Sequence, residues 1–235
     1  MAAHRCPIDT ELTEVARYGG FFAIPFGEPP DGWRLTSDCY RDGFSDLVAA
    51  TANRNRTNDL RVAASLVQFS IASRLWSPAI ACAVIHDVVP DFAEVYRAVN
   101  SAELLLARPA GVRVETEVDS AAALYEAVVV RHLEPLAAGL RVKVASGLLY
   151  GNTASAMVAA TRALYALEPG LRDKATRVAR ALLAHRKLAG TGTVKYNLAF
   201  RRRSCCLYYR VADGATCGDC GLADNQVTSA HHTHH

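Results

Sequence analysis

The chain has 235 residues, of which 51% are hydrophobic and 21% are charged, a balance typical of a globular protein with a sizeable core. Its formal net charge is only +3, and it has no long basic run, so the sequence lacks the strongly basic character typical of nucleic-acid-binding proteins. No stretch approaches the ~18 consecutive apolar residues of a transmembrane segment, and acidic residues precede any apolar run at the N-terminus, unlike in a secretory signal. We therefore expect a cytoplasmic protein, and peripheral attachment to the inner face of the membrane stays open.

The first half of the chain predicts helices. A short helix is expected over residues 10–18, before a segment rich in Gly, Pro and aromatic residues. Apolar residues recur at helical spacing over residues 60–76, which predicts a long helix there. Ser77 and Pro78 then predict a new helix, with Ser77 as N-cap and Pro78 in the first turn, ending near Asp87.

The second half predicts further helices and a minor β element. Residues 103–116 combine an apolar run, a Pro-Ala-Gly turn and alternating valines, which indicates a β-hairpin. A helix is expected over residues 119–133, and Pro135 should disturb its end. A second is expected from residue 152, after Gly151, and a third over residues 171–188. Residues 191–200 look strand-like. The fold class is therefore mainly α: a helical, bundle-like domain with a minor β-hairpin or strand element and a cysteine-rich C-terminal segment.

The cysteines are unevenly distributed along the chain. Four of the seven gather near the C-terminal end. These four are Cys205, Cys206, Cys217 and Cys220. The other three stand alone and are expected to be buried structural thiols: they are Cys6, Cys39 and Cys82. In a reducing compartment, a cysteine cluster indicates metal or redox chemistry rather than disulfides.

The residues alone leave the kind of metal site open. A structural zinc ion takes four thiolates, usually from two Cys-x2-Cys pairs, and Cys217 and Cys220 form one such pair. Adjacent residues such as Cys205 and Cys206 point in divergent directions, which suits a single ion poorly. A [2Fe–2S] cluster also takes four thiolates, but at two iron sites, so neighbouring side chains need not converge. The spacing does not exclude [4Fe–4S].

The sequence "RRSCCLYYR…CGDC", with its Cys-Cys-x10-Cys-x2-Cys spacing, resembles the C-terminal signature of the FhuF-type ferric-siderophore reductases. Three upstream stretches resemble the same family in the same order. They are "SRLWSPAIACAV" (73–84), "HLEPL" (132–136) and "LLYGNTASAM" (148–157). The resemblance covers residues 60–222, whereas residues 1–59 carry no matching signature.

The resemblance implies a [2Fe–2S] cluster bound by Cys205, Cys206, Cys217 and Cys220. It also implies one-electron reduction of ferric iron chelated by a siderophore, typically a hydroxamate, which releases ferrous iron in the cytoplasm. No Gly-x-Gly-x-x-Gly pattern follows a strand. We therefore expect no bound NAD(P)H or flavin, and an external electron donor such as a ferredoxin or flavodoxin.

The predicted organisation has three parts. A siderophore-reductase-like helical domain covers residues 1–200, of which 1–59 are unmatched. The cluster-binding segment covers residues 201–222, and a disordered tail that includes "HHTHH" covers residues 223–235.

Other functions remain open for the same residues. The chain is alternatively a [2Fe–2S] electron carrier or redox sensor without a siderophore substrate, or a zinc-stabilised interaction module. Siderophore assembly is a weaker alternative, because the chain lacks nucleotide sites. The arginines beside the cysteines either offset the charge of the cluster and attract an acidic donor, or form a solvated basic edge: they are Arg201, Arg202, Arg203 and Arg210.

Two other features have plainer interpretations. "GNTAS" (151–155) is expected to cap the helix that follows it, through Asn152 or Thr153, or to meet a polar or anionic group at the helix N-terminus. His132 and His185 are expected to be packed or exposed side chains rather than metal ligands.

Overall fold

The structure is a computed structural model that describes residues 5–212 and 214–222. The predicted tail, 223–235, lies outside these residues. Helices dominate the described chain, which confirms the mainly α fold class. No helix of the described residues is long and apolar enough to cross a membrane.

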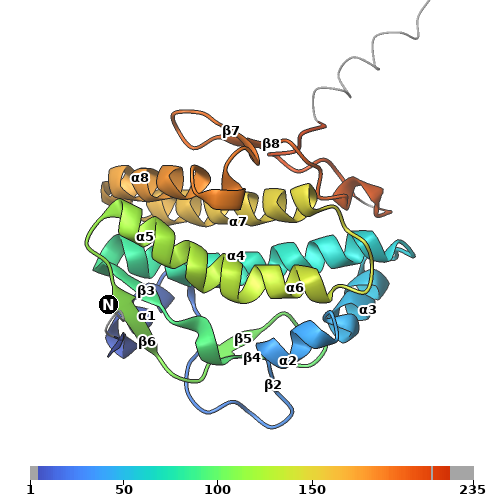
Figure 1. Cartoon of the computed structure of the whole chain (residues 1–235), viewed down its shortest axis with the longest axis horizontal. Helices are drawn as coiled ribbons and strands as arrows, with labels where there is room; N and C mark the ends of the chain where they lie inside the picture. Colours follow the sequence, from blue (N-terminus) through green and yellow to red (C-terminus); the bar gives the residue numbers. More distant parts are fainter. Residues whose placement is uncertain (1–4, 213, 223–235) are drawn as a thin grey trace, which may run out of the picture.

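The helices form layers around one long helix, α4 (Leu60–His86). Helices α7 (Ser146–Leu167) and α8 (Arg172–Leu183) lie on one side of it, and two small sheets lie on the other (Figure 1). Between these layers run α5 (Glu117–Leu124), the π-helix η3 (Tyr125–Leu133) and α6 (Glu134–Gly139). The helices near the sheets are α1 (Asp9–Ala16), α2 (Thr36–Arg41) and α3 (Ser45–Arg54). Single 3₁₀ turns are η1 (Gly20–Phe22), η2 (Phe92–Glu94), η4 (Pro169–Leu171), η5 (Arg186–Leu188) and η6 (Tyr208–Arg210).

Among the described residues, three small antiparallel sheets complete the fold. One sheet has the order β1 (Arg5–Pro7), β6 (Ala110–Arg113), β3 (Val88–Pro90). The second has the order β2 (Arg34–Leu35), β4 (Val95–Arg97), β5 (Leu104–Leu106). The third is the hairpin of β7 (Gly192–Val194) and β8 (Phe200–Arg202), in which Gly192 faces Arg202. This hairpin matches the strand-like pattern expected over residues 191–200.

The hairpin predicted over residues 103–116 is wrong. Both halves are strands, but β5 pairs with β4, whereas β6 pairs with β1 and β3. Alternating valines indicate a strand, but they do not indicate which strand pairs with it, and the partner can come from another part of the chain. Short-range spacing therefore located the strands and misassigned their partners.

The new helix predicted at Ser77 is also wrong, because α4 runs through Pro78 without a break. A proline inside a helix removes one backbone hydrogen bond and costs ~3 kcal/mol or more. Here both flanking turns are buried, with Trp76 and Ile80 fully enclosed. Ser77 does not cap a helix but donates its hydroxyl to the carbonyl of Ser73 at 2.9 Å. Burial of the whole helix outweighs the local cost of the proline.

The apolar core is continuous from Ile8 near the start of the described chain to Phe200 on β8. The hairpin β7–β8 and the cysteine segment lie over α7, on the side of the molecule away from the other two sheets (Figure 1). The core thus ends where the cysteines begin, and α4 and α7 form the floor on which the site is built.

Candidate metal centre

The cysteine segment, residues 203–222, rests directly on α4 and α7. Ser65, one turn into α4, donates its hydroxyl to the carbonyl of Cys206 at 2.8 Å. On α7, a Cβ atom at position 151 would collide with the hydroxyl of Ser204, so Gly151 allows the segment to approach the helix closely. A side chain at this point of the helix would hold the segment away from its floor.

The four thiols form two pairs. The sulfur atoms of Cys206 and Cys217 are 3.6 Å apart, and the side chains of Cys205 and Cys220 interact with each other. Cys206 and Cys220 are buried, whereas Cys205 and Cys217 are half-buried. Each adjacent cysteine of the Cys-Cys step therefore has its partner in the Cys-x2-Cys turn, and one member of each pair reaches toward the surface.

This pairing fits a group with two metal positions. A [2Fe–2S] cluster needs two thiolates at each iron, and two pairs of thiols match that number. Within residues 5–212 and 214–222, no three His, Cys, Asp or Glu side chains are grouped so that they could hold one metal ion. Backbone N–H groups of Leu207 and Leu222 also donate to the sulfurs of Cys205 and Cys220, at 3.3 and 3.4 Å, as is usual around metal-bound thiolates.

One arginine is buried against the thiols. Arg202 on β8 is 3% exposed, and its Nη2 donates to Cys217 Sγ at 2.6 Å and to Asp219 Oδ1 at 2.9 Å. Burial works against the charge of Arg202, but Asp219 and the cysteines outweigh it and raise the pKa of the guanidinium. The other arginines near the motif differ in position: Arg203 is exposed, and Arg210 pairs with Asp59 at 3.4 Å.

The "GNTAS" stretch is the other half of this site. The expectation that it begins and caps a helix is wrong, because α7 starts at Ser146 and the stretch lies inside the helix. Its polar side chains turn toward the cysteine segment and α4. Asn152 accepts a hydrogen bond from Nη1 of Arg202 at 2.7 Å and donates to the carbonyl and hydroxyl oxygens of Ser65 at 3.1 and 3.0 Å. Ser155 donates to Asp219.

Sequence reasoning missed this network. The available signal is that Gly151, Asn152 and Ser155 stand inside a long run of helix-forming residues, where small and polar side chains need a partner to be buried. Their partners lie 50 to 64 residues further along the chain or on α4, and no local pattern identifies them.

Burial also affects the thiols themselves. It raises the pKa of Cys217 to about 12, although Arg202 acts in the opposite direction, and it raises the pKa of Cys205. Without a metal these two side chains keep their protons at neutral pH. Binding iron to them must therefore release protons.

The histidines are structural, as the sequence indicated. His132 is buried, and its Nε2 donates to the carbonyl of Phe92 at 2.8 Å, so Nδ1 accepts from the hydroxyl of Tyr40. His185 is half-buried and packs edge-on against the ring of Tyr125 at 5.1 Å. Neither lies among the cysteines.

The three isolated cysteines agree with the expected structural role only in part. Cys39 and Cys82 are buried, whereas Cys6 is half-buried on β1. Burial raises the pKa of Cys82 to about 12, so this thiol is inert at neutral pH.

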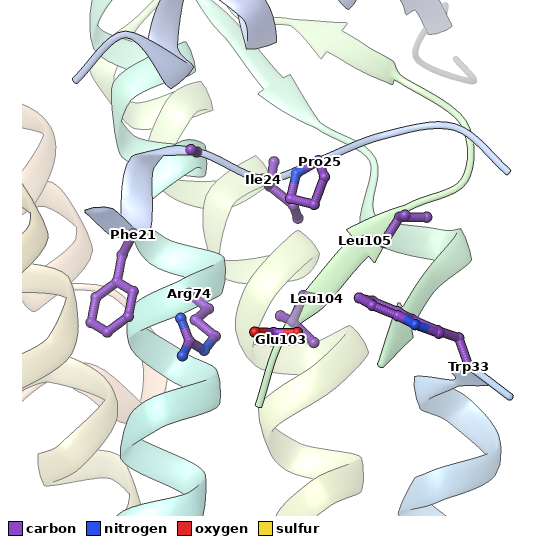
Figure 2. Close-up of a pocket in the computed structure, with 9 residues that line it drawn as sticks. Phe21, Ile24, Pro25, Trp33, Arg74, Glu103, Leu104 and Leu105 are labelled. Atoms are coloured by element: carbon purple, nitrogen blue, oxygen red, sulfur yellow. The ribbon is translucent and has the colours of Figure 1, made fainter. Parts of the chain in front are cut away.

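A pocket of about 450 Å³ lies between η1, α4 and β5. Figure 2 shows the Arg74 guanidinium inside it, with the Phe21 ring on one side and Glu103 on the other. The guanidinium carbon lies 4.5 Å from the centre of the Phe21 ring. Arg74 follows Ser65 by nine residues, ~13 Å along α4 and half a turn around it. The pocket therefore lies on the opposite side of α4 from the cysteines and is not part of the metal centre.

A basic groove of about 590 Å³ lies between α7, α8 and the tip of the β7–β8 hairpin. Its charged lining is Arg162, Arg172, Arg177, Arg180 and Asp173. Tyr165 and Tyr196 form its aromatic part, and Arg172 lies over the Tyr165 ring at 5.2 Å. The groove offers cationic and aromatic groups at the surface.

Comparison with known proteins identifies the cysteine segment. The family model of the FhuF 2Fe-2S C-terminal domain matches residues 202–221, and the four cysteines fit its motif. The match is consistent with an FhuF-type protein, as the sequence motifs indicated. The matched domain binds a [2Fe–2S] cluster, and the structure gathers its cysteines on α4 and α7. No curated protein matches the chain.

Proposed function

We propose that the protein reduces siderophore-chelated ferric iron by one electron, using a [2Fe–2S] cluster bound by Cys205, Cys206, Cys217 and Cys220. The pairing of these thiols in a segment that matches the FhuF 2Fe-2S domain carries the proposal. When bound, the cluster supplies a one-electron carrier. The substrate takes up one electron as Fe(III) becomes Fe(II), and the donor loses one.

The position of the thiols supports this chemistry. Cys205 and Cys217 are half-buried, so a bulky chelate can approach them without entering the protein. Hard oxygen ligands of a siderophore hold Fe(III) far more tightly than Fe(II), so the reduced iron is released. The protein need only bring the chelate close to the cluster and supply the electron.

We infer that an acidic redox protein, such as a ferredoxin or flavodoxin, docks at the basic groove to deliver that electron. Ser155, which bonds to Asp219 in the cysteine segment, and Arg162, which lines the groove, are seven residues apart on α7. Two turns of helix place them on one face, ~10 Å apart along the axis. An electron-transfer complex buries up to ~1,200 Å² in total, enough for one partner to cover the groove and reach the edge of the cysteine segment.

The reductase proposal has a direct kinetic test. Dithionite-reduced protein is mixed anaerobically with a ferric hydroxamate siderophore and a ferrous trap. We expect faster trapping than with a variant that lacks the four cysteines, and Cys82→Ser, which removes a remote buried thiol, should behave like the wild type. Trapping no faster than with the variant that lacks the four cysteines would instead identify an electron carrier or redox sensor. A colourless protein with stoichiometric zinc would overturn the cluster itself.

The donor site is tested separately. Reduced acidic ferredoxin should reduce the cluster more slowly as salt increases, and Arg162→Glu should slow it further. Arg17→Glu makes the same charge change directly after α1, a helix on the sheet side of the molecule (Figure 1), and should have little effect. Reduction by methyl viologen radical, a small cation, should not be slowed by either change. Equal effects of the two substitutions would place the donor elsewhere.

A further inference from the structure

We propose that Arg202 sets the reduction potential of the cluster through the Cys206–Cys217 pair, and that Asn152 and Ser65 hold Arg202 in position for this. The inference rests on the [2Fe–2S] cluster of the proposed function, but not on its siderophore substrate. Arg202 is a positioning residue, because it acts on the cluster through the sulfur of Cys217.

Burial distinguishes Arg202 from its neighbours. Its side chain is 1% exposed, so its charge acts through a medium of low dielectric constant and is little screened by salt. Arg203, the next residue, is exposed to solvent, where the same charge is screened by water and ions. Of these two adjacent arginines, only Arg202 donates to a thiol of the motif, at 2.6 Å from Cys217 Sγ.

The direction of the effect follows from charge. One electron from the donor converts one ferric ion of the cluster to ferrous; no bond breaks, and Arg202 keeps its proton because a guanidinium remains charged in proteins. The reduced form carries one more negative charge, which the guanidinium and its N–H···S bond stabilise. Arg202 therefore raises the potential. The carboxylate of Asp219, 2.9 Å from the same Nη2, acts in the opposite direction.

A closed set of hydrogen bonds fixes this geometry. Arg202 donates to the sulfur of Cys217 and to Asn152 on α7, and Asn152 donates to Ser65 on α4. Ser65 in turn donates to the carbonyl of Cys206, whose sulfur contacts that of Cys217. Both members of one thiol pair are thus tied to the same three side chains, two of them on buried helices. The distance between the charge and the pair is set by the packing of α4 on α7.

The test is the midpoint potential of the cluster-loaded protein, followed by EPR during a redox titration. Arg202→Gln should shift the equilibrium between the two forms at least tenfold toward the oxidised form, which is ~59 mV for one electron. Arg203→Gln removes the same charge from the next residue and should leave the potential unchanged. Asp219→Asn should raise it. A structural loosening would not move the potential in opposite directions.

Two further variants cover a failure of Arg202→Gln to retain its cluster. Arg202→Lys keeps the charge without the planar fork and should give a smaller fall in potential. Asn152→Ala releases Arg202 without removing it and should also lower the potential. An unchanged potential in a cluster-loaded Arg202 variant, or an equal shift in Arg203→Gln, would refute the inference. A wild-type protein without a [2Fe–2S] signal would refute the proposed function as well.

Discussion

Gly221, directly after Cys220, is a position at which a very small change should disturb the site. A Cβ atom there would lie 2.6 Å from the carbonyl oxygen of Arg202 on β8. That oxygen belongs to the backbone and cannot rotate away as a side chain would. Gly221→Ala must therefore push the Cys217–Cys220 turn away from β8. The turn is also tied to β8 by the Arg202 amide, which donates to the carbonyl of Asp219 at 2.9 Å.

The size of the effect comes from two opposing terms. Inserting one methyl group into a packed contact costs ~1–3 kcal/mol, whereas replacing glycine by alanine restricts the unfolded chain and returns ~0.4–1 kcal/mol. We expect a net loss of ~1–2 kcal/mol, which is a factor of ~5–30 in an equilibrium constant. Because the turn carries two of the four thiols, this loss should appear mainly in cluster retention.

The same turn contains its own control. A Cβ atom at Gly218 would meet no described atom within 4 Å, so Gly218→Ala makes the same chemical change in open space. Cluster absorbance during titration with an iron chelator should show weaker retention in Gly221→Ala only, and urea unfolding followed by circular dichroism should report the helical domain in parallel. If the two alanine variants lose iron equally readily, the close contact with β8 is not what holds the turn.

Three other outcomes are expected. Ser65→Ala removes the bonds to Cys206 and Asn152 and leaves buried groups unpaired, which should lower the free energy of unfolding by ~1–3 kcal/mol in urea titrations; an unchanged value would contradict the network. Burial lowers the pKa of His132 to about 4 in the folded protein. The imidazole of the unfolded chain therefore takes up a proton at a higher pH than the folded one, and ~3 kcal/mol of the free energy of unfolding should be lost as pH falls from ~6.5 to ~4. His132→Gln should flatten this pH dependence in unfolding curves measured across that range. Cys217→Ala should abolish the visible absorbance of the cluster, and retained absorbance would remove Cys217 from the ligand set.

The sequence could group the four cysteines into one candidate site because they are close together in the chain. Four thiols within one short segment, with the adjacent pair Cys205 and Cys206, indicate a metal group without any knowledge of the fold. The pairing of Cys206 with Cys217 is different, since it depends on how the turn folds back over the segment. Spacing could identify the set but not its internal order.

The partners of the site could not be predicted, because they come from distant parts of the chain. The spacing around Asn152 is equally compatible with a helix cap, and only the length of α7 places it inside the helix. The four arginines near the motif are alike in sequence. Burial alone separates Arg202 from them, and burial of a charged side chain depends on the tertiary partners that offset its desolvation.

The errors at Pro78 and at residues 103–116 have the same origin. Local rules describe what a segment prefers in isolation, and they correctly found a helix on each side of Pro78 and a strand in each half of 103–116. They do not describe how much apolar surface the rest of the chain can cover. Where that burial is large, as along α4, it outweighs the local preference.

The order of the site along the chain has a consequence for biosynthesis. Ser65 and Asn152 leave the ribosome well before any of the four cysteines of the motif, and chains fold progressively from the N-terminal side during synthesis. The floor formed by α4 and α7 can therefore be complete when the thiols emerge. Iron and sulfide would then be inserted last, into a short segment closing over a finished surface, and a shortage of iron would leave the helical domain intact and ready to be loaded.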